Sequence, residues 1–349
     1  MQPKKKKTPL IVLAKISRYA ICITLLTAFS LGIIIMSFNN GQVKAAQQPE
    51  NKANQTSTQT IPADAWKAPA PSTIPAGKTG AMIRYGRELV MNTAKYLGPH
   101  GSVAHLSNGM NCQNCHLYAG TKLYGNDFAS FMATSPKINP RSGKIISAAG
   151  RISECFQRSL AGTSPDTSKK EVQAILAYMR WVGKDVKKGQ IPFGGGSERL
   201  PFMDKAANPA LGKIVFMQKC KSCHGANGEG QLTADKISYT YPPLWGPHSY
   251  NDGASMFYIA SLAGFVKNNM PYGATYQRPQ LTNEESWNVA AFIDSQPRPH
   301  KDHHLDWTNL AKKRFDIPYG PYADSLSEKQ HKYGPFKPIL AAAQQKAAK

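Results

Sequence analysis

The chain has 349 residues, a formal charge of +22 and a hydrophobic fraction of 41%. This length exceeds what one small domain needs and suits two domains of about 100–200 residues with additional segments. The positive charge would attract anions, acidic proteins or membrane surfaces, and a merely solvated basic surface is the competing interpretation. The sequence contains no nucleic-acid-binding motif, so nucleic acid is excluded as the expected partner.

The N-terminal segment has the features of an export signal. Consecutive lysines precede an apolar stretch over residues 19–38, as in the positive and hydrophobic regions of a signal peptide. Val43 and Ala45 fit a signal-peptidase site, but the apolar stretch approaches the roughly 20 residues that span a bilayer. Residues 1–45 are therefore predicted as a signal peptide or a membrane anchor. The positive flank predicts a periplasmic protein, soluble after cleavage or tethered to the cytoplasmic membrane through residues 19–38.

Composition divides the remainder of the chain. Residues 46–75 are rich in Gln, Asn, Ala, Thr and Pro and poor in large apolar side chains, which predicts a disordered linker. The run Gly194-Gly195-Gly196 is typical of a connection between domains. We therefore expect one domain over residues 76–192, a second over 193–300 and a C-terminal extension over 301–349.

The first domain is expected to begin and end with a helix. The run Tyr85 to Leu97 has the apolar spacing of the initial helix. The final helix is expected to start with a capping box of Ser168 and Glu171. Its apolar positions are Val172, Ile175, Leu176 and Met179.

The second domain shows the same order of elements. Asn208 is expected to cap a helix that starts at Pro209. The apolar face of that helix would consist of Leu211, Val215 and Phe216. Thr282 and Glu285 form a second predicted capping box, ahead of the final helix.

Between the two helices of each domain lies one five-residue pattern. The two copies are Cys112-Gln-Asn-Cys115-His116 and Cys220-Lys-Ser-Cys223-His224. Two thiols at this spacing reach the two vinyl groups of one porphyrin, while the adjoining histidine binds the iron. Disulfides or a four-cysteine zinc site are disfavoured, because a histidine directly follows each second cysteine. The sequence thus predicts a mainly α fold with two class I cytochrome c domains in tandem, each carrying one covalently bound haem c.

The second haem iron needs a ligand opposite His224. Met270, followed by Pro271, lies between the attachment motif and the last helix, where class I cytochromes carry their axial methionine. Met256 is the other methionine in that interval. A thioether ligand raises the reduction potential, which suits a haem that collects electrons and passes them on. His224 and Met270 are therefore the predicted iron ligands.

The first domain has no histidine between His116 and Asn208 that would complete the coordination of its haem. Cys155 is a thiol without an evident disulfide partner, since four of the six cysteines belong to the haem motifs and Cys22 lies in the export segment. Such a thiol is a candidate for a reactive or metal-binding group. The alternative is a cysteine that fills the core, with Met132 as the iron ligand.

Basic residues lie close to Cys155 in the sequence. Arg151 and Arg158 are within four residues of it, and Arg141 and Lys144 come shortly before. Guanidinium groups match oxyanions, and a nearby cation lowers the pKa of a thiol. Each of these side chains alone is most often a solvated surface charge, but together beside a lone thiol they indicate an anion pocket.

Several further blocks accompany these motifs. They are Tyr85-Gly86-Arg87, Asn92-Thr93-Ala94, Tyr96-Leu97-Gly98, Asn114-Cys115-His116, Arg151-Ile152 with Cys155, Arg158 and Ser159, Met270-Pro271, Gln296-Pro297-Arg298-Pro299, Gly320-Pro321-Tyr322-Ala323-Asp324 and His331-Lys332-Tyr333-Gly334-Pro335-Phe336. With them the chain resembles, from about Tyr85 to Ile339, the tetrathionate-forming thiosulfate dehydrogenase family of dihaem cytochromes c. The resemblance implies oxidation of two thiosulfates to tetrathionate, and the reverse reduction at the same site. Electrons would pass from the first haem to the second and on to an external cytochrome.

The resemblance also implies roles for individual residues. His116 and Cys155 would be the iron ligands of the first, catalytic haem, and Arg141, Arg151 and Ser159 would line its anion site. Some relatives carry a lysine just before the axial methionine, where this chain has Asn269. The second haem is therefore expected to keep one ligand pair throughout.

Three other functions compete with this one. An electron carrier without a substrate would require Met132 on the first iron. A dihaem peroxidase is disfavoured, because it would need an open iron site and would leave Cys155 without a role. A sulfur-transfer cytochrome of the sulfur-oxidising type would pass sulfur to a carrier protein instead of releasing tetrathionate.

Overall fold

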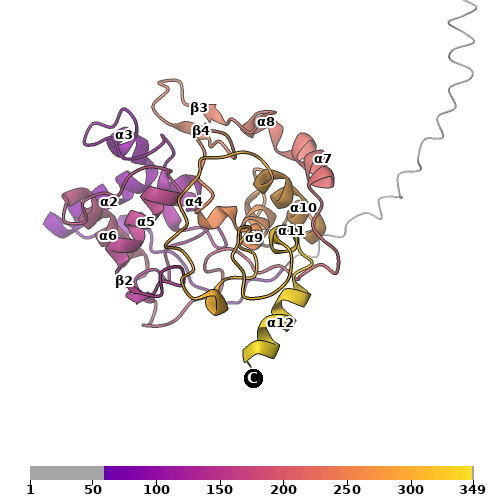
Figure 1. The fold of residues 1–349 in the computed structure, drawn as a ribbon. Coiled ribbons are helices and arrows are strands. Elements are labelled where there is room, and N and C mark those ends of the chain that lie inside the picture. Colours follow the sequence, from indigo (N-terminus) through magenta and orange to yellow (C-terminus); the bar gives the residue numbers. More distant parts are fainter. Residues whose placement is uncertain (1–58, 348–349) are drawn as a thin grey trace, which may run out of the picture. The chain divides into compact units, whose positions relative to one another are not determined.

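Helices make up most of the regular structure in residues 59–347, the part of the chain that the computed structural model describes (Figure 1). The predicted signal or anchor segment, residues 1–45, and the linker as far as residue 58 lie outside this part. In the remainder of the linker, Ala65 is buried and a 3₁₀ turn, η1, covers Pro71–Thr73. Among the described residues, none of the helices combines the length and apolar character required to cross a membrane.

The first helix pair consists of α2 (Gly77–Met91) and α6 (Lys170–Val182), which pack along one another. Their approach is close because Gly86 has no side chain. A Cβ atom at this position would lie 1.9 Å from the carbonyl oxygen of Ala174. The predicted helix Tyr85–Leu97 is wrong at its start and is divided, since α2 begins at Gly77 and ends at Met91, and a short helix, α3 (Thr93–Leu97), follows.

The start of α6 differs from the prediction. Its N-cap is Lys169, without a side-chain cap bond. Ser168 instead donates from its hydroxyl and backbone N–H to Asp166, at 2.7 and 2.9 Å. Glu171 accepts a 3.0 Å hydrogen bond from the hydroxyl of Tyr85. The predicted Ser168–Glu171 capping box is therefore wrong, because both side chains have other partners, and Glu171 joins α6 to α2.

The second helix pair consists of α7 (Pro209–Lys219) and α10 (Asn283–Asp294). It repeats the close crossing of the first pair, since a Cβ atom on Gly212 would lie 1.8 Å from the carbonyl oxygen of Asn288. Two helices brought together through a glycine of the first helix thus occur twice in the chain.

The predicted starts of this second pair are confirmed. Asn208 caps α7 by accepting from the backbone of Ala210 and Leu211. Thr282 and Glu285 form the predicted reciprocal capping box of α10. The predicted apolar face of α7 is partly wrong, because Leu211 is 44% exposed. It lies in the first turn of α7, whereas the buried Val215 and Phe216 follow a full turn later.

The remaining elements are short and connect the helix pairs. Around the first attachment motif and beyond it are η2 (Cys112–Asn114), α4 (Leu117–Gly120) and α5 (Ala148–Arg158), and around the second are α8 (Lys221–His224), η3 (Ser255–Phe257) and α9 (Ile259–Asn269). Two antiparallel ribbons pair β1 (Lys137–Ile138) with β2 (Ile145–Ile146), and β3 (Gln231–Leu232) with β4 (Tyr239–Tyr241). The last elements are η4 (Leu310–Lys312), α11 (Glu328–Tyr333) and α12 (Lys337–Ala347).

The glycine run 194–196 lies against residues 124–126, the loop that follows the first attachment motif. The backbone N–H of Tyr124 donates to the carbonyl oxygen of Gly194 at 2.6 Å, and that of Asn126 donates to Gly196 at 3.0 Å. Two peptide groups of the loop are thus held by the predicted domain connection.

Residues after 300 contact α10 and the segment that leads to α5. Phe315 and Phe336 pack with Phe202, beside α10. The backbone N–H of Trp307 donates to the carbonyl oxygen of Arg141, at 2.6 Å, in the segment that leads to α5. The two helix pairs and the C-terminal segment therefore share one core.

Candidate functional site

The two motif histidines are held in the same way. The Nδ1–H of His116 donates to the carbonyl oxygen of Asn126 at 2.5 Å, and that of His224 donates to the carbonyl oxygen of Pro242 at 2.9 Å. A donating Nδ1 leaves Nε2 without a proton and available for a metal. Burial is the main cause that lowers the pKa of both imidazoles, which keeps them neutral. Both histidines thus have the tautomer that an iron ligand requires.

Cys155, on α5, lies near enough to the first pair of attachment thiols to affect their ionisation. Burial, and secondly the proximity of Cys155, raise the pKa of Cys115 to about 12. The pKa of Cys112 is raised to about 11, again mainly by burial, with a smaller contribution from Cys155. None of the four motif cysteines, nor Cys155, forms a disulfide. The fold therefore brings Cys155 to the place where the first haem would be attached.

Met270 and Met256 are the two candidate ligands for the second haem iron, and their surroundings differ. Met270 is partly buried at the end of α9. The sulfur of Met256 instead accepts from the side chain of Asn126, 3.6 Å away, in the loop that holds His116. Asn269 is buried and its amide donates to Tyr124 and Phe265 at 2.9 and 2.8 Å. These contacts favour Met270, whose ligand role stays a prediction.

Several buried polar atoms could donate hydrogen bonds to the propionate groups of a haem. Among the described residues, the hydroxyls of Tyr250 and Ser153 and the Nε of Arg298 are buried without a hydrogen-bond partner. Buried donors of this kind are costly unless they are paired. Tyr250 lies near Cys115, and Ser153 is on α5 two residues before Cys155. A bound haem c, whose propionates accept hydrogen bonds, would provide the missing acceptors.

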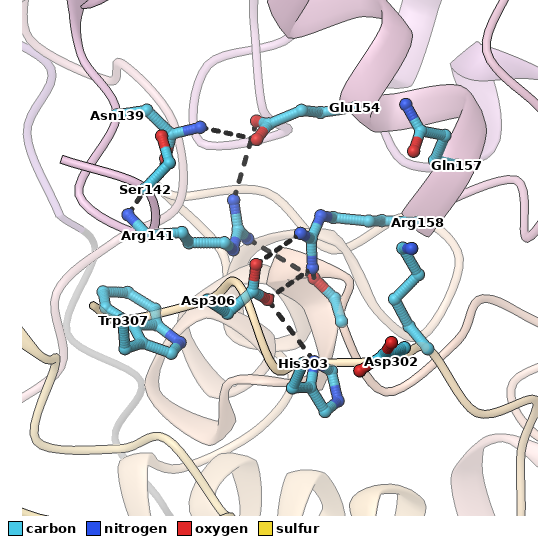
Figure 2. Close-up of polar contacts among 12 residues, drawn as sticks. Asn139, Arg141, Ser142, Glu154, Gln157, Arg158, Asp302, His303, Asp306 and Trp307 are labelled. Atoms are coloured by element: carbon cyan, nitrogen blue, oxygen red, sulfur yellow. Dashed lines mark hydrogen bonds and ion pairs between the residues drawn. The ribbon is translucent and has the colours of Figure 1, made fainter. Parts of the chain in front are cut away.

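Arg141 is an interior residue with most of its donors occupied. It is 5% exposed, and its Nε donates to the hydroxyl of Tyr258 at 3.0 Å. Its terminal nitrogens contact Ser255 at 3.3 Å, Gly253 at 3.4 Å and Glu154 at 3.7 Å. Arg141 therefore positions the segment before α5 against the second half of the chain (Figure 2). Its predicted part in anion binding stays a prediction.

Arg151 is the more accessible of the two predicted arginines. Its side chain is 27% exposed and lies 2.9 Å from Glu154, one turn further along α5. Its charge also contributes to lowering the pKa of His116, after burial, so it lies on the side of the first attachment motif. Ser159 ends α5, where its backbone N–H donates to the carbonyl oxygen of Cys155. Arg151 thus combines access with proximity to the motif, and the roles of Arg151 and Ser159 in anion binding stay predictions.

Arg158 donates, like Arg141, to the carbonyl oxygen of Gly253, and it pairs with the C-terminal segment. It donates two hydrogen bonds of 2.7 Å to Asp306, both side chains being largely buried (Figure 2). Although burial alone would raise the pKa of Asp306, the bonds from His303 and Arg158 lower it to about 2. Asp306 therefore stays ionised and fixes the end of α5.

The Asp306 pair predicts a pH-dependent contribution to stability. The carboxyl of Asp306 has a lower pKa in the folded state than the ordinary 3.8, so its contribution is complete above about pH 4 and is lost as the pH falls toward about 2. In Asp306→Asn, Arg158 would be buried without a counter-ion, and we expect a loss of about 3 kcal/mol at neutral pH. Urea denaturation between neutral pH and about pH 3 should show the wild type and this variant converging in acid. The control is Asp302→Asn, which changes an exposed carboxylate in the same segment; a constant difference across the range would contradict the assignment.

Some residues of this region were not predicted from the sequence. Glu154, Tyr258 and Asp306 fix Arg141, Arg151 and Arg158, but nothing in their sequence context marked them as partners. The histidine-rich run 300–304 was the available signal for the polar cluster beside Asp306.

The fold and the two attachment motifs define a cytochrome c. The sequence model of the family described as cytochrome c matches residues 209–297, which include α7, the second motif and α10. A cytochrome c domain of this kind carries covalently bound haem c.

Comparison with known proteins shows which family of cytochromes c the chain belongs to. The chain is 36% identical over 246 residues to thiosulfate dehydrogenase of Psychrobacter arcticus. The aligned residues make up 70% of this chain and 72% of the relative. The chain is 35% identical over 242 residues to thiosulfate dehydrogenase of Allochromatium vinosum, with 68% and 86% covered. The chain therefore belongs to the thiosulfate dehydrogenase family.

A solved structure agrees with this family. The thiosulfate dehydrogenase TsdBA from Marichromatium purpuratum, in its form as isolated, matches with a TM-score of 0.63 and 29% identity. The match covers 68% of this chain and 50% of that one, so this chain spans about half the length of the solved chain.

Proposed function

We propose that this protein oxidises two thiosulfate ions to tetrathionate with the release of two electrons, and that the same site catalyses the reverse reduction. The observation that carries the proposal is the position of Cys155, a thiol outside the motifs, beside Cys112 and Cys115 in a chain of this family. A soluble electron carrier would have no use for a thiol at that position.

The proposed architecture is two tandem class I cytochrome c domains, residues 76–192 and 193–300, with a wrapping C-terminal extension over 301–349. The repeated helix crossing and the matched histidine contacts support it. His116 and Cys155 would hold one iron and His224 and Met270 the other. When bound, the two haem c groups accept the electrons, which pass from the first to the second and on to an external cytochrome.

Cys155 would act as the nucleophile. Its thiolate forms a bond with the outer sulfur of one thiosulfate, and this pair of sulfurs gives up two electrons to the acceptors. A second thiosulfate then attacks the outer sulfur, so the bond to Cys155 breaks, tetrathionate leaves and the thiolate is restored. Each turnover thus consumes two thiosulfates and returns Cys155 unchanged.

Arg151 would position the anions. Its guanidinium is partly exposed, and Glu154 holds it in one orientation at 2.9 Å. Two dianions repel one another, so a fixed cation lowers the energy of bringing them together. Arg141 would act on this site through Glu154, which it contacts at 3.7 Å, and Ser159 would complete the site at the end of α5.

The export segment supports a periplasmic location for this reaction, with the chain either free after cleavage or tethered through residues 19–38. The net positive charge would guide thiosulfate and an acidic cytochrome partner toward the protein.

The proposal is tested with the purified, fully haem-loaded wild-type protein under anaerobic conditions. Thiosulfate and a one-electron artificial acceptor are supplied, and tetrathionate and reduced acceptor are quantified. We expect one tetrathionate for every two thiosulfates consumed and every two acceptor molecules reduced. Reduction of the acceptor without tetrathionate would favour sulfur transfer, and absence of turnover would leave an electron carrier.

A further inference from the structure

Three side chains with metal-binding atoms converge outside the two attachment motifs. The Nδ1 of His300 lies 2.7 Å from one carboxylate oxygen of Asp252, and the Nε2 of His303 lies 3.1 Å from the other. One potential ligand atom from each residue falls within 4.8 Å of the others. Two imidazoles and a carboxylate form a set that suits Zn²⁺ and its neighbours in the first transition row.

The distances are close to those of an occupied tetrahedral centre. Zinc bonds of about 2.0–2.2 Å place neighbouring ligand atoms about 3.3 Å apart. The observed 2.7 and 3.1 Å separations are about 0.6 and 0.2 Å shorter than this, and the ligand atoms of the two histidines lie within 4.8 Å of one another, so side-chain rotations would bring the three atoms round one ion. The backbone already supports the carboxylate, since the N–H of Lys301 donates to Asp252 at 2.7 Å.

His303 provides a second, independent observation. Its Nε2 is buried and lies 3.1 Å from Asp252, and among the described residues no hydrogen bond of good geometry is found for it. An imidazole nitrogen and a carboxylate oxygen at this separation can both bind one common metal ion. The side chain is 14% exposed, so free access to solvent does not supply a hydrogen-bond partner.

The other nitrogen of His303 has the environment of a metal ligand. Its Nδ1 lies 3.4 Å from Asp306, which Arg158 in turn holds by two bonds of 2.7 Å (Figure 2). Histidines that bind metals usually donate this nitrogen to a carboxylate, which fixes the ring and its tautomer. Tyr319 stacks on the same ring at a centroid distance of 3.9 Å. The ring is thus fixed with Nε2 toward Asp252 and His300.

We propose that Asp252, His300 and His303 bind one divalent transition-metal ion such as Zn²⁺, with solvent as the fourth ligand, and thereby fasten the C-terminal segment to the loop before η3. Asp252 comes from the second half of the chain, and the two histidines follow α10. The neighbouring Asn251 donates its backbone N–H to the carbonyl oxygen of Arg158, so the same ion also secures the end of α5. None of the three residues belongs to an attachment motif or is a predicted iron ligand, and the site does not depend on the proposed reaction.

The test uses untagged, haem-loaded protein, freed of metal with a chelator and titrated with Zn²⁺ by isothermal calorimetry. His300→Ala is the main variant, because this side chain is 73% exposed and its loss leaves the interior unchanged. His304→Ala is the matched control, since His304 is an exposed imidazole of the same segment and lies outside the three-residue set. Loss of a ligand is expected to weaken Zn²⁺ binding by about 100-fold or more.

We expect one Zn²⁺ per wild-type chain, a higher melting temperature with Zn²⁺, both effects lost in His300→Ala and both retained in His304→Ala. Wild-type protein that binds no stoichiometric Zn²⁺ would overturn the proposal and leave a network of hydrogen-bonded histidines and carboxylates. Equal losses in the two variants would also overturn it, because that result would indicate binding to any surface imidazole.

Discussion

Cys155→Ala is expected to abolish tetrathionate formation while leaving both haem groups attached. The substitution removes the thiol beside Cys112 and Cys115 but leaves both attachment motifs and both motif histidines intact. If Cys155 forms the bond to the outer sulfur, its loss should lower the rate by roughly 10³-fold or more, as removal of a nucleophile commonly does. If Cys155 is also the proposed iron ligand, the visible spectrum of the first haem should change as well.

Gln157→Ala is the matched control for this experiment. Gln157 lies on α5 two residues after Cys155, and it holds Asn251 through its backbone carbonyl oxygen, which alanine retains. This variant should keep both the spectrum and the rate. Tetrathionate formation at the wild-type rate by Cys155→Ala would rule out the covalent route and would favour Met132 as the ligand of the first iron.

Gly212→Ala should strongly destabilise the protein. In an ordinary helix this change is favourable by about 0.5–1 kcal/mol, because alanine is the better helix former. Here the added Cβ would lie 1.8 Å from the carbonyl oxygen of Asn288, so α7 and α10 would have to separate. Overpacking commonly costs about 1–3 kcal/mol, and a backbone oxygen cannot rotate away, so we expect a loss of about 3 kcal/mol or more.

Urea denaturation followed by circular dichroism measures this effect, with Lys213→Ala as the control. Lys213 is the exposed neighbour of Gly212 in α7 and should change stability only slightly. A Gly212→Ala protein as stable as the wild type would show that the two helices are further apart than described here.

Local sequence signals predicted the attachment motifs and two of the three capped helix starts. Asn208 and the Thr282–Glu285 box were predictable because each cap is satisfied within three residues. The Ser168–Glu171 box has the same sequence pattern, yet it is wrong because Tyr85, far away in the sequence, takes Glu171. A local rule fails where a distant partner competes for the same group.

In the candidate site too, the residues marked by local sequence patterns were predictable and their distant partners were not. His116, His224 and the four motif cysteines follow from spacing alone, and the single thiol of Cys155 was visible as an unpaired residue. The surroundings of the arginines were not predictable, because Arg141 and Arg158 meet partners from segments more than 100 residues away. Charge clustering in the sequence indicated an anion pocket, whereas the fold buries two of these cations in contacts with Tyr258 and Asp306.

The glycine run also determines where the chain can be cut. Gly194 and Gly196 accept hydrogen bonds from Tyr124 and Asn126, and Asn126 in turn accepts from the imidazole of His116. A fragment ending at residue 192 would leave those two amides without acceptors and loosen the histidine that should face the iron. The minimal autonomous first half therefore extends at least through Gly196, and insertions in this run would alter the ligand field of its haem.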